Sequence, residues 1–442
     1  MSIKLTFDEI KTACACDCKH NLDGMFEIST DTRTIKKGDI YLPLKGENFD
    51  GEKFCQDALE KGASACFCTN DGVEGITLRV KNTLDAYLKI ARYVREKYNP
   101  TVIGITGSSG KTTTKEMVYS VVSEKYKTQK TFSNHNNEIG FCQTVMSMDE
   151  DTQVLIVEMG MRGLGEIELI SKYAKPDFSV ITNAGSAHIG RLGSLDNIAI
   201  AKCEITKYTK NTLVANKNER IKKFASQDLN KIFYSINDVK IIEKRIGYSK
   251  FEYKNREYEL NCEGDYNIEN SLAAIEIGYK LNMSYDEIRQ GLLKYKPIEK
   301  RWEIKDTAGY KIINDSYNAN PDSMKAAVKT FLELYKNSVV VLGNMGELGD
   351  DEIELHKGVG KFIIDNFKND CAKFIIVGNL AQHIGEVLEQ QGFSVKYFND
   401  NIATSRYILD NVDVGTTIFL KASRSMKFEQ IIDKLNEREK IL

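Results

Sequence analysis

The sequence lacks the features that mark membrane proteins and nucleic-acid-binding proteins. No run of about 18 apolar residues occurs along the chain, and its first residues, MSIKLTFDEIKTACACDC, contain no uninterrupted apolar segment of the signal-peptide type. The 61 Lys and Arg residues nearly balance the 63 Asp and Glu residues, so there is neither a basic excess nor an acidic tail. We therefore expect a cytoplasmic protein with no nucleic-acid partner and no membrane insertion.

Repeats and zinc-type cysteine spacings are also missing. No repeat with a period of about 20–50 residues and no low-complexity tract is visible. The ten cysteines include the spacings C-x-C-x-C at 14–18 and C-x-C at 66–68, which differ from the C-x2-C spacing of zinc sites. A metal site is the alternative, but the cysteines are better explained as free thiols in a reducing compartment.

Breaks in the hydrophobic pattern predict three α/β domains. Residues 1–98 mix short strands and helices and end in the helical pattern TLDAYLKIARYVREKY. Asn99-Pro100 then interrupts the chain, because the residue before a proline is pushed away from helical geometry. Residues 99–297 alternate the buried strands TVIGIT, VLIVEM, FSVIT and TLVAN with helical patterns, which indicates a parallel sheet with crossover helices. KFEYKNREYEL adds a hairpin, and residues 298–442 restart the alternation with SVVVLGN, KFIIVGN and TTIFLKAS.

The segment GITGSSGKTTTKE, residues 104–116, follows an extended run and opens a helix, as phosphate-binding loops do. Its glycines let backbone N–H groups surround an anion, Lys111 can reach the β- and γ-phosphates, and the Thr112 hydroxyl can bind Mg2+. The position five before Gly110 is Ile105, so the strict G-x4-G-K-[ST] pattern is not met and a chance Gly-Lys-Thr is the alternative. The expected nucleotide contacts in the loop are Gly107, Ser108, Ser109, Gly110, Lys111, Thr112 and Thr113.

Two further strand patterns end in residues suited to a metal-assisted reaction. VLIVE ends at Glu158, and an acidic residue at the carboxyl end of a buried parallel strand faces the phosphate loop, where a Mg2+ ligand is expected. The next strand leads into TNAGSAHIGRLGS, which brings His188 to the same edge. A histidine packed structurally in its loop is the alternative. The phosphate loop alone leaves a motor, a regulatory switch and a ligase open.

The ordered motifs resemble those of the Mur ligases of peptidoglycan synthesis. The motifs are GITGSSGKTTTKE, NHNNEIG, EMGMRGLGEI, NAGSAHIGRLGS, GDYNIENSLAA, NDSYNANPDSM and VLGNMGELG, and they extend over nearly the whole chain. The resemblance implies a central phosphate-loop domain, an N-terminal UDP-substrate domain and a Rossmann-like C-terminal domain that closes on ATP. It is strongest to the dipeptide-adding branch, which joins D-alanyl-D-alanine to UDP-N-acetylmuramoyl-tripeptide through an acyl phosphate. A third-residue-adding enzyme or a folylpolyglutamate synthetase is the alternative.

The resemblance also implies roles for individual residues. On ATP, Asn270 is expected at the adenine, Asp315 at the ribose and Arg301 at the phosphates. The residues expected at the UDP-substrate are Ser29, Thr30, Asp31, Thr32, Arg33, Lys45, Asn48, Asn134, Asn136 and Asn137. Those expected at the dipeptide are Asn318, Asn320, Ser423 and Arg424. Structural alternatives are a polar turn at DTRTIKKGD, a polar loop at NHNNEIG, a helix cap at Asn270, a turn at Asp315 and a surface arginine at position 301.

A metal centre is implied as well. The resemblance predicts two Mg2+ ions held by Thr112, Glu158, His188 and Lys202, and a catalytic set of Lys111, Glu158, His188 and Lys202. Related ligases place a carbamylated lysine in this segment, so Lys202, fourteen residues after His188, is expected to take up CO2. Carbamylation would turn a repelling cation into an anion with the hard oxygen atoms that Mg2+ prefers. The alternative is an ordinary helix lysine that faces solvent or pairs with a glutamate. We expect the protein to be a monomer. The alternatives to a ligase are an inactive nucleotide-binding scaffold and a motor.

Overall fold

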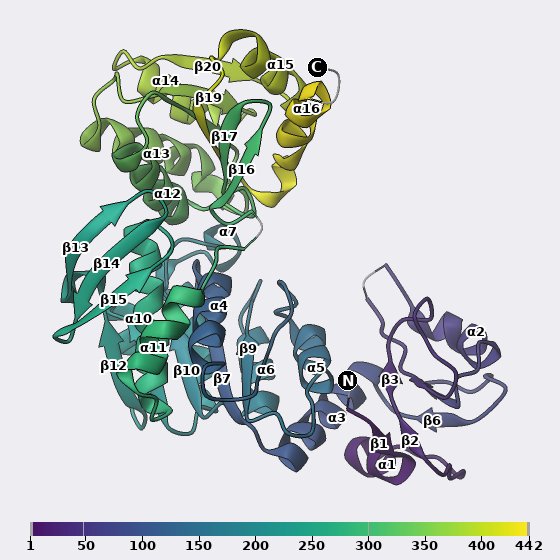
Figure 1. Cartoon of the computed structure of the whole chain (residues 1–442). Helices are drawn as coiled ribbons and strands as arrows, with labels where there is room; N and C mark the ends of the chain where they lie inside the picture. Colours follow the sequence, from purple (N-terminus) through teal and green to yellow (C-terminus); the bar gives the residue numbers. More distant parts are fainter. Residues whose placement is uncertain (1–2, 47, 299, 440–442) are drawn as a thin grey trace.

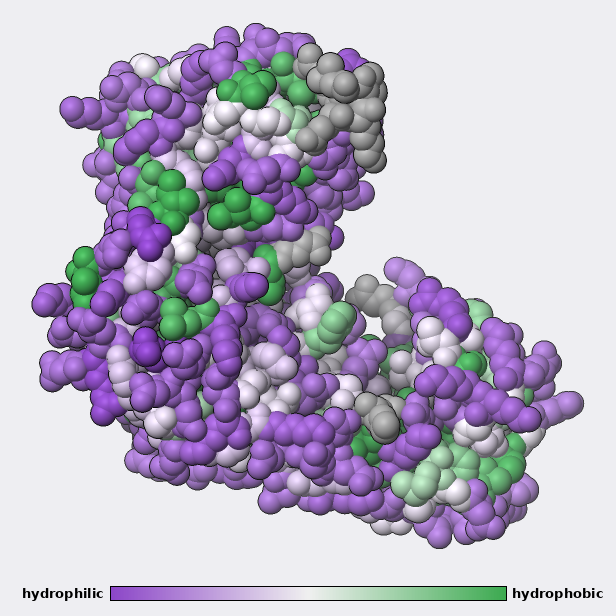
Figure 2. Space-filling view, in the orientation of Figure 1, coloured by the Kyte–Doolittle hydropathy of each residue, from purple (hydrophilic) through white to green (hydrophobic). Residues whose placement is uncertain are grey.

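The computed structural model describes residues 3–46, 48–298 and 300–439 as three α/β domains in series (Figure 1). The central and C-terminal domains are stacked, and the N-terminal domain extends to the side, so the chain forms a bent molecule (Figure 1). Figure 2 shows a mainly hydrophilic surface with an open hollow between the N-terminal and C-terminal domains. No helix among the described residues combines the length and apolar character that crossing a membrane requires.

The N-terminal domain has a four-stranded parallel sheet in the order β3-β4-β5-β6 and an antiparallel β1-β2 pair. Its long helix α3 starts where Asn82 accepts a hydrogen bond from the Asp85 N–H and ends where Asn99 turns left-handed before Pro100. This confirms the predicted helix. The elements are β1 Leu5–Thr6, α1 Phe7–Cys14, β2 Met25–Phe26, β3 Ile28–Ser29, β4 Ile40–Tyr41, α2 Cys55–Glu60, β5 Ala65–Cys68, β6 Thr77–Arg79 and α3 Thr83–Tyr98.

The central domain contains a six-stranded sheet in the order β12-β11-β10-β7-β9-β8, and all its strand pairs are parallel, as predicted. The four predicted strands are β7, β9, β10 and β11, and β8 and β12 were not predicted. Its strands and helices are β7 Thr101–Thr106, α4 Lys111–Val122, β8 Thr128–Lys130, α5 Glu138–Met146, β9 Val154–Glu158, α6 Glu166–Ala174, β10 Phe178–Ile181, α7 Ile189–Leu192, α8 Leu195–Cys203, β11 Thr212–Asn216, α9 Glu219–Phe224 and β12 Asn230–Tyr234. They continue with β13 Val239–Arg245, β14 Tyr248–Tyr253, β15 Arg256–Leu260, α10 Asp265–Lys280 and α11 Tyr285–Lys294. The predicted hairpin is β14-β15; β13, which the sequence did not predict, adds a third strand.

Alternating side chains of the central strands bury both faces of this sheet. Ile103 and Ile105 of β7 pack with α4, α10 and α11 on one face, while Val102 packs with α3, α5, α6 and α8 on the other. The second core is continuous with the core of the N-terminal domain. Because all six strands run the same way, their carboxyl ends share one edge, and the loops after β7, β9 and β10 meet there.

The C-terminal domain has the sheet order β16-β17-β21-β18-β19-β20, parallel except for the edge strand β16. The predicted strands SVVVLGN, KFIIVGN and TTIFLKAS correspond to β18, β19 and β21. The elements are β16 Glu303–Thr307, β17 Tyr310–Asn314, α12 Pro321–Leu334, β18 Ser338–Gly343, α13 Glu352–Asn366, β19 Lys373–Val377, α14 Gln382–Glu389, β20 Val395–Phe398, α15 Asn401–Asn411, β21 Thr417–Lys421 and α16 Glu429–Glu439. The carboxyl ends of β17 and β21 face the central domain.

Candidate active site

A cavity of about 1270 Å³ lies between the carboxyl edge of the central sheet and the C-terminal domain. It brings together residues from segments that are far apart in the sequence. The sequence-predicted residues that line it are Ser108, Ser109, Gly110, Lys111, Thr112, Thr113, Asn134, Asn136, Asn137, Glu158, His188, Asn270, Arg301, Asp315, Asn318, Asn320, Ser423 and Arg424. Most of the predicted nucleotide and metal residues therefore share one space.

The phosphate loop is folded tightly at its two glycines. Gly107 has φ +151°, and a Cβ there would lie 1.9 Å from Thr182 Oγ1; Gly110 has φ +75°, and its Cβ would lie 2.5 Å from Asn270 Oδ1. The Ser109 N–H donates to Asn183 Oδ1 at 2.9 Å, and Lys111 Nζ donates to the Gly107 carbonyl at 2.8 Å. The loop is therefore held by Asn183, which follows the neighbouring strand β10, and the Lys111 side chain folds back onto the loop.

Lys111 lies in an environment that favours binding of an anion. Burial lowers the pKa of the Lys111 ammonium, the neighbouring Arg301 cation lowers it further, and the Glu158 carboxylate acts in the opposite direction. Two cations that destabilise each other's charge are both stabilised by an anion placed between them. A nucleotide phosphate supplies such an anion, and the start of α4 adds free backbone N–H groups.

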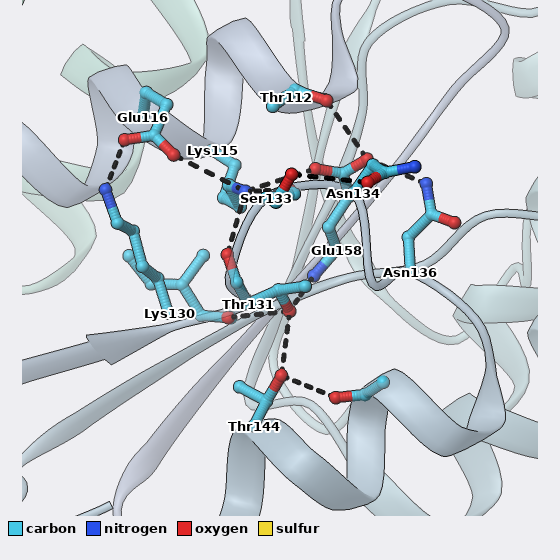
Figure 3. Close-up of polar contacts among 12 residues, drawn as sticks. Thr112, Lys115, Glu116, Lys130, Thr131, Ser133, Asn134, Asn136, Thr144 and Glu158 are labelled. Carbon is cyan, nitrogen blue, oxygen red and sulfur yellow. Dashed lines mark hydrogen bonds and ion pairs between the residues drawn. The ribbon is translucent and has the colours of Figure 1, made fainter. Parts of the chain in front are cut away.

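Glu158, at the end of β9, has one oxygen held in place and one without a hydrogen bond (Figure 3). Its Oε1 accepts from Thr112 Oγ1 at 3.2 Å and from Asn136 Nδ2 at 3.0 Å. Its buried Oε2 has no hydrogen-bond partner among the described residues, although Lys115 Nζ lies 3.5 Å away. A carboxylate oriented in this way keeps oxygen lone pairs available for a hard cation.

Arg301 reaches across the domain interface to the phosphate loop. Its Nη2 donates to Thr112 Oγ1 at 3.0 Å, and its guanidinium lies 3.9 Å from the ring centroid of Tyr317. Nearby, Asp322 Oδ2 accepts from the backbone N–H of Ser186 at 2.8 Å and from its hydroxyl at 2.9 Å. These contacts fix the C-terminal domain against the central loops. The alternative of a surface arginine on a linker is wrong for Arg301.

Two other contacts from the C-terminal domain complete this side of the cavity. Asp315, just after β17, accepts a hydrogen bond from Lys421 Nζ at 2.5 Å. Glu347 Oε2 lies 2.5 Å from Nδ1 of His188. Burial lowers the pKa of the His188 imidazole, the Glu347 carboxylate opposes this, and the cations of Lys202 and Lys111 add to the lowering.

Lys202 differs from the ordinary solvated lysine that its helix pattern suggested. It has no accessible surface, and its Nζ has no hydrogen-bond partner in the described ranges. Burial, and then repulsion by Lys111, lower the pKa of this ammonium well below its usual value, while Glu204 and Glu166 oppose the shift. Lys202 does not line the cavity, and neither does Gly107. The alternative of a solvent-facing lysine is wrong.

The asparagines expected at substrates have different local roles. Asn137 Oδ1 accepts from the Gly140 N–H and caps α5, and Asn320 Oδ1 accepts from the Ser323 N–H and caps α12, both at 2.9 Å. Asn270 lies inside α10 and accepts from Thr114 Oγ1 at 3.2 Å, so the helix-cap alternative is wrong for it. Asn134 Oδ1 accepts from the Ser133 hydroxyl at 3.2 Å.

The remaining dipeptide candidates lie at the C-terminal side of the cavity. Asn318 is exposed, and its carbonyl accepts a hydrogen bond from Lys421 Nζ at 3.4 Å. Ser423 is buried, with its Oγ 3.1 Å from Ser425 Oγ, whereas Arg424 is exposed and pairs with Glu429 at 3.4 Å. Their contact with a dipeptide stays a prediction.

The residues predicted to hold the UDP end lie apart from this cavity, in the N-terminal domain. They are Ser29, Thr30, Asp31, Thr32, Arg33, Lys45 and Asn48, and none of them lines it. Asp31 and Arg33 form an ion pair of 2.6 Å, and Lys45 pairs with Asp50 at 3.2 Å. Both pairs are solvent-accessible, so a charged ligand can exchange for them at small cost.

Five residues that shape the site were not predicted from the sequence: Lys115, Asn183, Tyr317, Glu347 and Lys421. Asn183 follows β10, and Lys421 ends β21. The rule that singled out Glu158, a polar residue at the carboxyl end of a buried strand, would have found both. The other three carry no comparable local signal, because a helix lysine or a loop tyrosine or glutamate is usually solvated.

Fold and site together define a three-domain α/β protein whose phosphate-binding loop faces a second domain across a shared cavity. Family models match in chain order: "Mur ligase family, catalytic domain" at residues 27–101, "Mur ligase middle domain" at 105–278 and "Mur ligase, glutamate ligase domain" at 300–424. The chain belongs to the Mur ligase family.

Its relatives match over nearly their full length. The UDP-N-acetylmuramoyl-tripeptide–D-alanyl-D-alanine ligase of Bacillus subtilis is 35% identical over 93% of both chains, and that of Synechocystis is 31% identical over 98% of both. The structure of MurF from Acinetobacter baumannii superposes with a TM-score of 0.90 at 26% identity, covering 99% of both chains. MurF from Thermotoga maritima in complex with ADP gives 0.83 at 25% identity, covering 94% of this chain and 98% of that one.

Proposed function

We propose that this protein joins D-alanyl-D-alanine to UDP-N-acetylmuramoyl-tripeptide with ATP, giving the UDP-muramoyl-pentapeptide, ADP and phosphate. The observation that carries this proposal is the 35% identity, over 93% of both chains, to the B. subtilis ligase of that name. The cavity supports it, because the phosphate loop and Arg301 of the C-terminal domain converge on one space.

The reaction requires a new leaving group. An amine cannot displace an oxygen atom from a carboxylate at neutral pH, because oxide would have to leave. Transfer of the γ-phosphoryl group of ATP to the terminal carboxylate of the tripeptide makes an acyl phosphate and releases ADP. The free amine of the dipeptide then adds to the acyl carbon and loses a proton, and the tetrahedral intermediate expels phosphate to leave the amide. Lys111 and Arg301 offset the repulsion between the two anions of the first step.

The described residues fit a Mg2+ ion bound together with the nucleotide. The Glu158 Oε2 atom is buried without a hydrogen bond and is the kind of hard ligand that Mg2+ takes, and the Thr112 hydroxyl lies beside the same carboxylate. No three His, Cys, Asp or Glu side chains within the described ranges form a ready metal cluster. Phosphate oxygens and water would therefore complete the coordination, as is usual for this ion. When bound, Mg2+ neutralises charge on the phosphates.

Carbamylation of Lys202 belongs to the same proposal. A neutral amine is the form that adds to CO2, and it then loses one proton to give an anionic carbamate. The burial of Lys202 and its lowered pKa favour that neutral form at physiological pH. The carbamate would also remove the repulsion between the Lys202 and Lys111 ammonium groups. His188 and the carbamate would supply the second Mg2+ site.

The substrate contacts complete the proposal. The N-terminal set from Ser29 to Asn48 holds the UDP end, the 134–137 loop meets the muramoyl peptide, and the exposed guanidinium of Arg424 suits the dipeptide carboxylate. The protein acts as a monomer in the cytoplasm.

A mass assay tests the function. ATP, D-alanyl-D-alanine and either the lysine-containing or the diaminopimelate-containing UDP-muramoyl-tripeptide are incubated with the protein. The expected result is a pentapeptide product and stoichiometric phosphate with one of the two. Product formed only from UDP-muramoyl-dipeptide and a free amino acid would identify a third-residue-adding enzyme. Phosphate release without ligation, or release stimulated by a polymer, would overturn the proposal.

A further inference from the structure

Lys115 is a fully buried cation one helical turn beyond Lys111, on helix α4 (Figure 3). Its Nζ donates to the backbone carbonyls of Thr131 and Ser133, both at 2.8 Å. The same atom lies 3.4 Å from Oε1 of Glu116 and 3.5 Å from Oε2 of Glu158. Burying an ammonium group is costly unless it is both hydrogen-bonded and paired, and here it is both.

The charge of Lys115 serves Glu158 more than Glu116. Glu116 has a second, more accessible partner, because its Oε2 contacts Lys130 Nζ. The side chain of Glu158 is only 1% exposed, and Lys115 is the cation that pairs with it within 4 Å among the described residues. Lys115 and Asn136 approach the Glu158 carboxylate from opposite sides in Figure 3.

The carbonyls that Lys115 binds belong to the segment leading into the 134–137 loop. Thr131 Oγ1 also accepts from the backbone N–H of Glu158 at 3.0 Å. One ammonium group therefore joins three parts of the site: the phosphate-loop helix, the end of β9 and the loop that carries Asn136. Two of its three N–H donors are used by carbonyls, so Glu158 Oε2 receives positive charge without losing a lone pair to a short hydrogen bond.

We propose that Lys115 is a positioning residue that keeps the Glu158 carboxylate directed at nucleotide-bound Mg2+, and that ties this carboxylate to the 134–137 loop. The inference rests on the proposed function for the identity of the nucleotide and the metal. A lysine suits this position, because one compact ammonium group donates to the two carbonyls and still places its charge 3.5 Å from the Glu158 carboxylate. The planar guanidinium of arginine cannot do this.

The test compares the binding of a non-hydrolysable ATP analogue with and without Mg2+ by calorimetry. In the wild type, Mg2+ should tighten the binding. In Lys115→Met we expect the Mg2+-dependent gain in affinity for the analogue to be about 10- to 100-fold smaller than in the wild type. This is the usual effect of removing a group that orients a metal ligand. Lys130→Met is the matched control: it removes the other cation beside Glu116 and should keep the gain. Lys115→Met with an unchanged gain overturns the proposal.

The double variant Lys115→Met/Glu158→Gln covers the case in which the single variant fails to fold. If the lysine serves Glu158, removal of both charges should restore folding, because no buried carboxylate is then left unpaired. A double variant less stable than Lys115→Met overturns the pairing. Neither measurement needs the peptide substrates, so failure of the ligation assay and failure of this inference are distinguishable.

Discussion

Glu347 of the C-terminal domain lies 2.5 Å from Nδ1 of His188 at the start of helix α7 in the central domain. The backbone carbonyl of Glu347 also accepts from the Gly190 N–H at 3.1 Å, so the contact is anchored by the main chain. A carboxylate this close to one ring nitrogen favours a proton on that nitrogen, which leaves Nε2 as the nitrogen that can face a metal or phosphate. The orientation of His188 therefore depends on the position of the C-terminal domain.

Glu347→Gln should lower the ligation rate by about 10-fold, because an amide holds the histidine less firmly than a carboxylate. It should also lower the pKa of His188 further, since the Glu347 charge is what opposes the effect of burial. Steady-state kinetics and NMR titration of the imidazole would measure the two effects. Glu354→Gln, on the exposed side of α13, is the control, and equal behaviour of the two variants would contradict the assignment.

Lys111→Ala should abolish ATP-dependent ligation while the fold is kept. We expect kcat to fall by about 100- to 1000-fold or more, because the lost charge acts on the transferring phosphoryl group. Product formation and the melting temperature would be measured together. Lys125→Ala removes an exposed lysine just beyond the same helix and should leave kcat unchanged. Near-normal turnover in Lys111→Ala would exclude a catalytic role for the phosphate loop.

Domain closure should follow binding of the UDP-substrate more than binding of ATP. The C-terminal residues Arg301 and Asp315 already line the cavity with the phosphate loop, whereas the N-terminal set lies apart from it. Figure 2 shows the hollow that separates the N-terminal and C-terminal domains. Asn99-Pro100 is the natural hinge. Small-angle scattering should show a smaller radius of gyration with UDP-substrate plus an ATP analogue; no compaction would count against this prediction.

Lys202→Ala should lose most activity and regain part of it with short carboxylic acids, which replace the carbamate anion. Wild-type protein in ¹³C-bicarbonate should show a carbamate signal in its NMR spectrum that is absent from the variant. Lys207→Ala, which removes an exposed lysine paired with Glu168, is the control and should keep both activity and signal. Full activity of Lys202→Ala without added acid, or an unmodified amine at Lys202 in a substrate-bound crystal structure, would contradict carbamylation.

The parallel sheets, the phosphate loop and the strand-end position of Glu158 could be predicted from the sequence, because each depends on a short-range rule. A short continuous apolar run indicates a strand buried on both faces, glycines permit a sharp loop, and a parallel strand places its last residue at the carboxyl edge of the sheet. The same rules predicted the helix before Asn99-Pro100 and the hairpin at β14-β15, and the structure confirms both. The strand β13 was missed because its segment, VKIIEKR, lacks the alternation of apolar and polar residues that marks a half-buried strand, and most of its side chains are exposed.

The tertiary structure alone decided which charges lie in the interior and which residues meet across domains. Helix α8 has apolar residues on more than one face, so its pattern cannot say that Lys202 is the side chain turned inward. Lys115 is buried because the 131–133 carbonyls close over it, and His188 meets Glu347 because two domains dock. Such contacts join segments separated by many residues, and their energies depend on burial. The sequence determined the elements and the phosphate loop, while packing determined the electrostatics of the site.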